Sequence, residues 1–213
     1  MNTKKWYFSI AMLCCLAGVS AQETSNSRNF PAQISIWHPV GTHGQQSREH
    51  TYNLSLNLLY GRVGGVNGLE ISGLVSVVEG NVRGIQLAGL ANATGNVNGM
   101  QVAGLANATG DVRGMQVAGF ANATGVANAI QIAGFANATG VASGIQVAGF
   151  ANATGNVRGM QVAGFANASG SANAIQIAGF ANATGDATGI QIAGFGNATG
   201  NVRGIQLAGI GTS

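Results

Sequence analysis

Residues 89–103 read Gly-Leu-Ala-Asn-Ala-Thr-Gly-Asn-Val-Asn-Gly-Met-Gln-Val-Ala, and most of the chain consists of variants of this unit. The unit restarts without a slip every fifteen residues, at Gly104, Gly119, Gly134, Gly149, Gly164, Gly179 and Gly194. With a looser unit at 73–88, residues 73–213 contain about nine units. A short fixed period indicates a repeat architecture, in which each unit packs only on its neighbours.

Each unit contains one stretch in which apolar and polar residues alternate. Examples are Met-Gln-Val at 115–117 and Ile-Gln-Ile at 130–132. A period of two is typical of a strand with one buried face. Glycine recurs too often for a helix, because each interior glycine costs about 1 kcal/mol relative to alanine. The Asn-Ala-Thr-Gly segment is predicted to be a turn, since asparagine and glycine tolerate positive φ.

These patterns predict an all-β fold, a β-solenoid of about nine 15-residue coils with an N-terminal cap. Coils in such a stack lie about 4.8 Å apart. Met, Ile and Val beside each Gln are expected to form an aliphatic wall. A phenylalanine in six successive units is expected to form a stacked column, at Phe120, Phe135, Phe150, Phe165, Phe180 and Phe195.

The alternative fold is an outer-membrane β-barrel, in which each unit supplies one strand and a short turn. Gln, Phe, Asn and Thr would face inward, Met and Val would face lipid, and closure would remove free strand edges. Against this alternative, residues 73–213 contain no Tyr or Trp for the interfacial girdles of such barrels.

Two polar columns recur in every complete unit, one of glutamine and one of asparagine. They are either structural ladders of stacked amides, as in cross-β assemblies, or an uncharged face for a repetitive ligand such as a surface glycan. The candidate residues are Gln101, Gln116, Gln131, Gln146, Gln161, Gln176, Gln191, Asn107, Asn122, Asn137, Asn152, Asn167 and Asn182. The Asn-Ala-Thr triplets also match the N-glycosylation acceptor, which we interpret as a repeated turn.

Composition excludes two classes of protein. The chain has 35 Gly but only 2 Pro, and glycine does not recur every third residue, so it is not collagen. Charged residues are 7% and hydrophobic residues 46%, which argues against a solvated disordered chain.

Residues 1–21 are predicted to be a secretory signal peptide. Lys4 and Lys5 form its basic start, residues 6–16 are apolar but too short to span a bilayer, and cleavage is expected after Ala21. Removing these two lysines from the nine basic residues leaves seven against six acidic ones, a net charge of +1 that predicts no nucleic-acid binding. Cys14 and Cys15 lie in this segment, so the exported chain would have no disulfide.

The region before the repeats differs in composition. Residues 22–29 are predicted to be a flexible leader, 30–72 a cap with degenerate coils, and 73–213 the repeat domain. His38, His43 and His50, with Glu49, match no tight metal-ligand spacing, so we expect polar loop residues and no metal or cofactor. The chain has no Gly-x-Ser-x-Gly elbow and no phosphate-binding Gly-Lys-Ser/Thr loop, so it is predicted not to be an enzyme.

The pattern Gly-(Val/Ile/Met)-Gln-(Ile/Val)-Ala-Gly-(Leu/Phe)-x-Asn resembles a family of bacterial short-repeat surface proteins. The lead-in at 55–61, Ser-Leu-Asn-Leu-Leu-Tyr-Gly, and the stretch 65–74 also resemble that family. The resemblance implies export from a Gram-negative cell and a surface or outer-membrane address. It implies no known catalysis and no site residues.

The leading hypothesis is therefore an exported, non-enzymatic cell-surface protein, either a structural scaffold or an adhesin-like binding module. An outer-membrane barrel is the alternative. A minor alternative is ice binding, through a flat array of the Asn and Thr columns. Because residues 194–213 contain no capping signal, self-association through this end is also expected.

Overall fold

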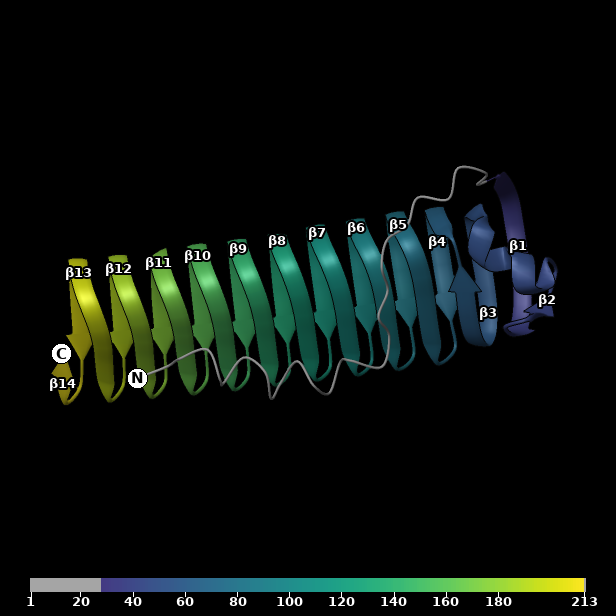
Figure 1. Ribbon diagram of the computed structural model, residues 1–213. Helices are drawn as coiled ribbons and strands as arrows, with labels where there is room; N and C mark the ends of the chain where they lie inside the picture. The colour runs from purple at the N-terminus through teal and green to yellow at the C-terminus, as the bar shows by residue number, and fades with distance from the viewer. Residues whose placement is uncertain (1–27, 213) are drawn as a thin grey trace. The chain divides into compact units, whose positions relative to one another are not determined.

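The chain forms an all-β solenoid of about 11 turns of 13–15 residues, described for residues 28–212 by a computed structural model (Figure 1). This confirms the predicted fold class. The predicted signal peptide and leader residues 22–27 lie outside the described residues. The turns outnumber the predicted nine because the strands of 51–72 already pair with their successors as regular coils do.

The chain divides into two compact units, with the boundary between Asp111 and Val112. The first contains β1 (Asn29–Trp37), β2 (Val40–Gly41), the 3-10 helix η2 (Gly44–Glu49), β3 (Thr51–Val63), β4 (Gly65–Ser72), β5 (Val75–Ala88) and β6 (Ala91–Ala103). Strand β7 (Ala106–Ala118) contains the boundary. The second contains β8 (Ala121–Ala133), β9 (Ala136–Ala148), β10 (Ala151–Ala163), β11 (Ala166–Ala178), β12 (Ala181–Ala193), β13 (Gly196–Ala208) and β14 (Gly211–Thr212).

Strands of the second unit pair in parallel with the next strand of the chain. The register joins each residue to its equivalent in the next repeat, as in the pair Gln131 and Gln146. In the first unit β3 to β6 also pair in parallel, and the β1–β2 hairpin lies at one end. The barrel alternative is wrong, because its up-and-down strands would be antiparallel.

The predicted turn at Asn-Ala-Thr-Gly is also wrong. Strand β8 runs for 13 residues straight through Asn122 and Thr124, and the chain bends instead at Gly119 and Phe120. No non-glycine residue described has positive φ. Within residues 73–212 such angles occur at glycines that precede the Met or Ile, as at Gly144 with φ 134°. Asparagine's tolerance of a turn is overridden because its amide is paired inside the coil.

The usual placement of polar and apolar side chains is reversed in the coils, because polar side chains are buried and large apolar ones are partly exposed. Gln131 is fully buried, whereas its neighbours Ile130 and Ile132 are 37% and 38% exposed. In β3, Ser55 is likewise buried while Leu58 is 65% exposed. The predicted aliphatic wall therefore faces outward. Small apolar side chains complete the interior, among them a cluster of Ala142, Val157, Ala172 and Ala174.

Candidate binding surface and interior ladders

The glutamine ladder is a continuous chain of side-chain hydrogen bonds. Gln131 donates from Nε2 to Gln116 Oε1 at 2.8 Å and to Thr124 Oγ1 at 2.9 Å. Its own Oε1 accepts from Gln146 Nε2 at 2.8 Å and from Thr139 Oγ1 at 2.9 Å. Both ends of each such amide are used, so the ladder fixes neighbouring coils in register.

The asparagine ladder pairs side chains with both the next coil and the backbone. Asn137 Nδ2 donates to Asn152 Oδ1 at 2.9 Å and to the Val147 carbonyl oxygen at 2.9 Å. The same two bonds recur at Asn152 and Asn167. The amide thus joins the two sides of a coil as well as successive coils.

The candidate Gln and Asn residues are at most 2% exposed. They present no surface to a glycan, and a buried, paired Asn is not accessible as a glycosylation acceptor. The Thr column is at most 9% exposed from Thr94 to Thr184, so the array behind the ice-binding hypothesis also faces inward. The contacts of these residues are those of structural ladders.

Glu70 takes the place of a glutamine in this interior. It pairs in register with Gln86 and is fully buried. Asn57 Nδ2 donates to its Oε1 at 3.2 Å, and Gln86 Nε2 donates to its Oε2 at 3.3 Å. Burial raises the pKa of Glu70 to about 7, although hydrogen bonds from Ser76, Gln86, Asn57 and Ser55 oppose the rise. The match between residues 69–71 and later Met-Gln-Val stretches points to this position in the sequence.

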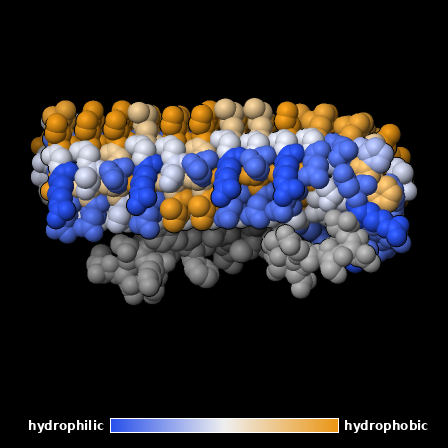
Figure 2. Space-filling model, turned by 90° about the horizontal axis from the view of Figure 1, so that it is seen from above, coloured by the Kyte–Doolittle hydropathy of each residue, from blue (hydrophilic) through white to orange (hydrophobic). Residues whose placement is uncertain are grey.

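The predicted phenylalanine column is confirmed, and it lies on the exterior. Successive rings from Phe120 to Phe180 stack with centroids 4.9 Å apart and planes within 2° of parallel. Each ring is 40–47% exposed. Figure 2 looks onto the polar edge, so the phenylalanine column lies on its far side, and the apolar side chains that it shows along one face of each unit belong to other positions of the coils.

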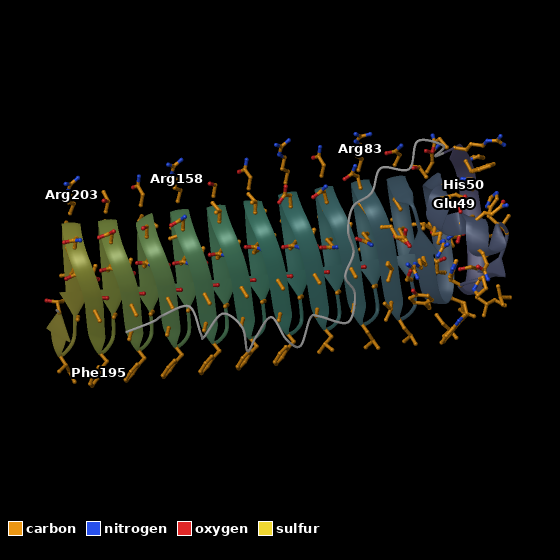
Figure 3. The ribbon with its side chains drawn as sticks, in the orientation of Figure 1. Glu49, His50, Arg83, Arg158, Phe195 and Arg203 are labelled. Carbon is orange, nitrogen blue, oxygen red and sulfur yellow. The ribbon has the colours of Figure 1, made fainter. Side chains whose placement is uncertain are left out.

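The opposite edge is polar. In the second unit Arg158 and Arg203 extend from one edge and Phe195 from the other (Figure 3). At that polar edge Asn201 Nδ2 donates to Asp186 Oδ1 at 2.7 Å. An open groove of about 480 Å³ follows it, with polar lining residues that include Ser143, Asn156, Arg158, Asn173 and Thr188.

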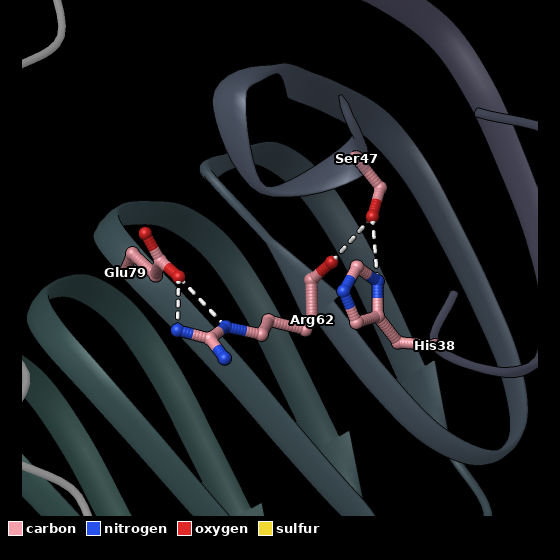
Figure 4. A network of polar contacts seen from close by, with 4 residues as sticks. All are labelled: His38, Ser47, Arg62 and Glu79. Carbon is pink, nitrogen blue, oxygen red and sulfur yellow. Dashed lines mark hydrogen bonds and ion pairs between the residues drawn. The ribbon is translucent and has the colours of Figure 1, made fainter. Parts of the chain in front are cut away.

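A serine and a histidine meet in the cap, without the features of a catalytic pair. His38 Nδ1 lies 3.0 Å from Ser47 Oγ, and Ser47 Oγ donates to the Arg62 carbonyl oxygen at 2.8 Å (Figure 4). Ser47 is only 3% exposed, and the nearby carboxylate of Glu79 is bound by Arg62 Nε at 2.7 Å. Burial, then Arg62 and Arg48, lower the pKa of His38. The contacts fasten η2 to β3.

The other two histidines lie among aromatic rings. His43 and His50 have their ring centroids 4.5 and 4.9 Å from that of Phe30. Burial of the neighbouring Tyr52 raises its pKa to about 12. Within residues 28–212 no three His, Cys, Asp or Glu side chains group closely enough to hold a metal ion.

Within the described part of the chain, no helix has the length and hydropathy needed to cross a bilayer. Neither a protein-family model, nor a curated protein, nor a solved structure was found to match the chain. The resemblance to bacterial short-repeat surface proteins therefore stays a prediction.

Proposed function

We propose that the protein is an exported, non-enzymatic surface protein, a scaffold whose apolar exterior makes it an adhesin-like binding module. The inverted polarity of the coils carries this proposal. Large apolar side chains are usually required in a protein's core, but here they are displayed on the surface. Contiguous exposed apolar surface of more than a few hundred Å² marks interaction sites.

Coil stacking uses the backbone ladder and the buried amides, and outer side chains such as Ile130 and Phe135, which also pack on neighbouring coils, still leave more than a third of their surface exposed. Gln131 and Asn137 each bond to both neighbouring coils or to both sides of one coil. The outer columns therefore supply contact area that the fold itself leaves unused. Their free energy of burial is available to a partner.

The columns repeat the same chemistry in each coil. Ile130, Ile145 and Ile192 are 37–39% exposed at equivalent or adjacent outward positions. Such uniform surface suits an extended or continuous apolar target better than a small molecule, which needs a concave site with a few convergent polar groups.

Adsorption of the purified full chain to octyl-coated and hydroxyl-coated beads tests this function. We expect strong preference for the octyl surface, and a several-fold loss of it in the double variant Ile130→Ser, Ile145→Ser. The exchange Asn128→Ser with Ser143→Asn, in the same coils but at the polar edge, is the matched control and should bind as the original chain does. Equal binding to both bead types would contradict the proposal.

Export is tested separately by labelling intact cells with a membrane-impermeant reagent. The full chain should be labelled at the surface, and a chain beginning at Gln22 should stay inside the cell. Labelling of neither or of both would overturn the export part of the proposal.

A further inference from the structure

We propose that the phenylalanine edge of the second unit inserts shallowly into the acyl region of a lipid bilayer, with the polar edge left in water. The phenylalanine edge is the column Phe120, Phe135, Phe150, Phe165, Phe180 and Phe195 with the flanking Gly and Ala residues. This inference rests on the proposed function, because it names the apolar surface that the exterior binds.

The N–H groups of this edge are paired within the solenoid. At the bend before β9, the N–H groups of Gly134, Phe135 and Ala136 donate at 3.1, 2.9 and 3.1 Å to carbonyl oxygens of the preceding coil. The same three bonds recur in the following coils. Lipid contains no hydrogen-bonding partner, and an unpaired backbone group there costs several kcal/mol. Entry of this edge would leave none of these N–H groups unpaired.

Glycine makes this close approach possible. A Cβ on Gly134 would collide with the carbonyl oxygen of Gly119, and the same collision recurs at Gly149 and Gly164. This oxygen accepts from none of the bend's N–H groups and lies against the next glycine instead. The bend is thus compact and holds no charged or hydroxyl side chain between Ala133 and Ala136.

Charge is segregated to the other edge. The charged residues between 112 and 212 are Arg113, Arg158, Asp186 and Arg203. All of them precede the Met or Ile of their repeats, and Figure 3 shows Arg158 and Arg203 pointing away from the edge that carries Phe195. A segment with one apolar side and one polar side can lie at the membrane surface with only its apolar side immersed.

A second copy of the chain fits this edge less well than lipid does. The six rings are each less than half exposed, so with about 200 Å² per ring they offer about 500 Å² per copy. Even with perfect contact the rings of two such edges would bury about 1,000 Å², and the bend glycines add only backbone, so the interface would lie at or below the low end of the usual range of stable interfaces. A fluid acyl phase requires no matching shape. Since the arginines lie away from this edge, binding should depend little on anionic lipid or salt.

Flotation of the full chain with phosphatidylcholine vesicles tests the inference. The original chain should float with the vesicles at low and high salt, and equally with vesicles containing phosphatidylglycerol. The double variant Phe135→Ser, Phe150→Ser should partition at least about tenfold more weakly, because two half-exposed rings are lost from the apolar phase. Circular dichroism should show that it keeps its β structure.

The matched control is Val126→Ser, Val141→Ser. These valines are 47% and 41% exposed, as much as the phenylalanines, but lie at the polar edge where other repeats have Asn, Asp or Ser. This variant should float like the original chain. Equal flotation of both double variants, or a loss in both, would overturn the inference.

Failure of the inference can be told from failure of the proposed function. A chain that binds octyl beads but stays below the vesicles would overturn lipid insertion and leave the adhesin-like role. A chain that binds neither would overturn both. If the original chain does not float but forms a discrete dimer, and the phenylalanine variant stays monomeric, this edge binds a second copy of the chain instead of lipid.

Discussion

At the scale of single residues, Glu70 is the position where the interior departs from its own pattern. A glutamine there would offer both a donor and an acceptor, as Gln86 and Gln101 do, whereas a carboxylate only accepts. Glu70 is fully buried, and its hydrogen bonds come from neutral donors such as Asn57 and Gln86. Its ionisation therefore opposes folding.

This leads to a pH-dependent prediction. Because the pKa of Glu70 is raised from 4.5 to about 7 in the folded chain, its favourable contribution is complete below pH 4.5 and is lost as the pH rises through 7. Stability should therefore fall between these values and level off above, by at most about 3 kcal/mol. Glu70→Gln should remove this fall and stabilise the protein most at alkaline pH. Urea unfolding at several pH values measures it.

The control substitution is Glu79→Gln. Glu79 lies at the surface in an ion pair with Arg62, so loss of this pair should change the free energy of unfolding by at most about 1 kcal/mol. The variant should still lose stability between pH 4.5 and about 7 as the original chain does. If Glu70→Gln retains the full pH dependence, the carboxyl of Glu70 is not its source.

At the scale of the coil, one strand bends around two layers of amides. The bend at Gly119 and Phe120 returns the chain to the start of the next strand. Each turn repeats the same close backbone approach, and the buried amides then meet their equivalents at a constant spacing. The geometry of the bend therefore sets the geometry of the ladders.

The prediction at this scale concerns the bend glycine. Gly134→Ala would drive a Cβ into the Gly119 carbonyl oxygen, a backbone atom that cannot move without shifting the coil. We expect a loss of about 1–3 kcal/mol, typical of overpacking, and a lower thermal midpoint by circular dichroism. Gly196→Ala is the control: it restores the alanine of the other repeats, and the nearest atom to its Cβ would be 3.3 Å away. Equal midpoints for the two variants would be the contrary result.

At the scale of the molecule, the solenoid is a stack of interchangeable units. Each strand of the second unit pairs with its neighbours through equivalent residues, as β10 does with β9 and β11. Stability in such stacks is approximately a sum over units and nearest-neighbour interfaces. The same repetition makes the exterior uniform, which is why the proposed partner is a continuous surface.

A deletion of one whole repeat tests this interchangeability. Removal of residues 149–163 places β9 directly before β11, whose ladder residues match, so the chain should stay soluble and β-rich with a somewhat lower urea midpoint. Removal of Ala153 alone, inside β10, places Thr154 at the outward position next to Asn152 and breaks the alternation of buried and outward residues. That chain should be far more sensitive to proteolysis. Equal resistance in the two deletions would contradict in-register stacking.

The repeat by itself determined the strand class, the fifteen-residue period, the parallel register of equivalent residues, and the stacking of phenylalanine and amide columns. These follow from the period, because identical units stacked in register bring identical side chains together. The acid at position 70 is also visible as a departure from the glutamine pattern.

Only the tertiary structure decided which face is inside. Alternation along Ile130, Gln131 and Ile132 is the same whether the isoleucines or the glutamine are buried, and ordinary preference favours burying isoleucine. Stacking reverses that preference, since each buried amide finds both its donor and acceptor partners in adjacent coils. The same long-range pairing draws Asn122 and Thr124 into a strand rather than a turn. Partners fifteen residues away lie beyond what a local pattern can show.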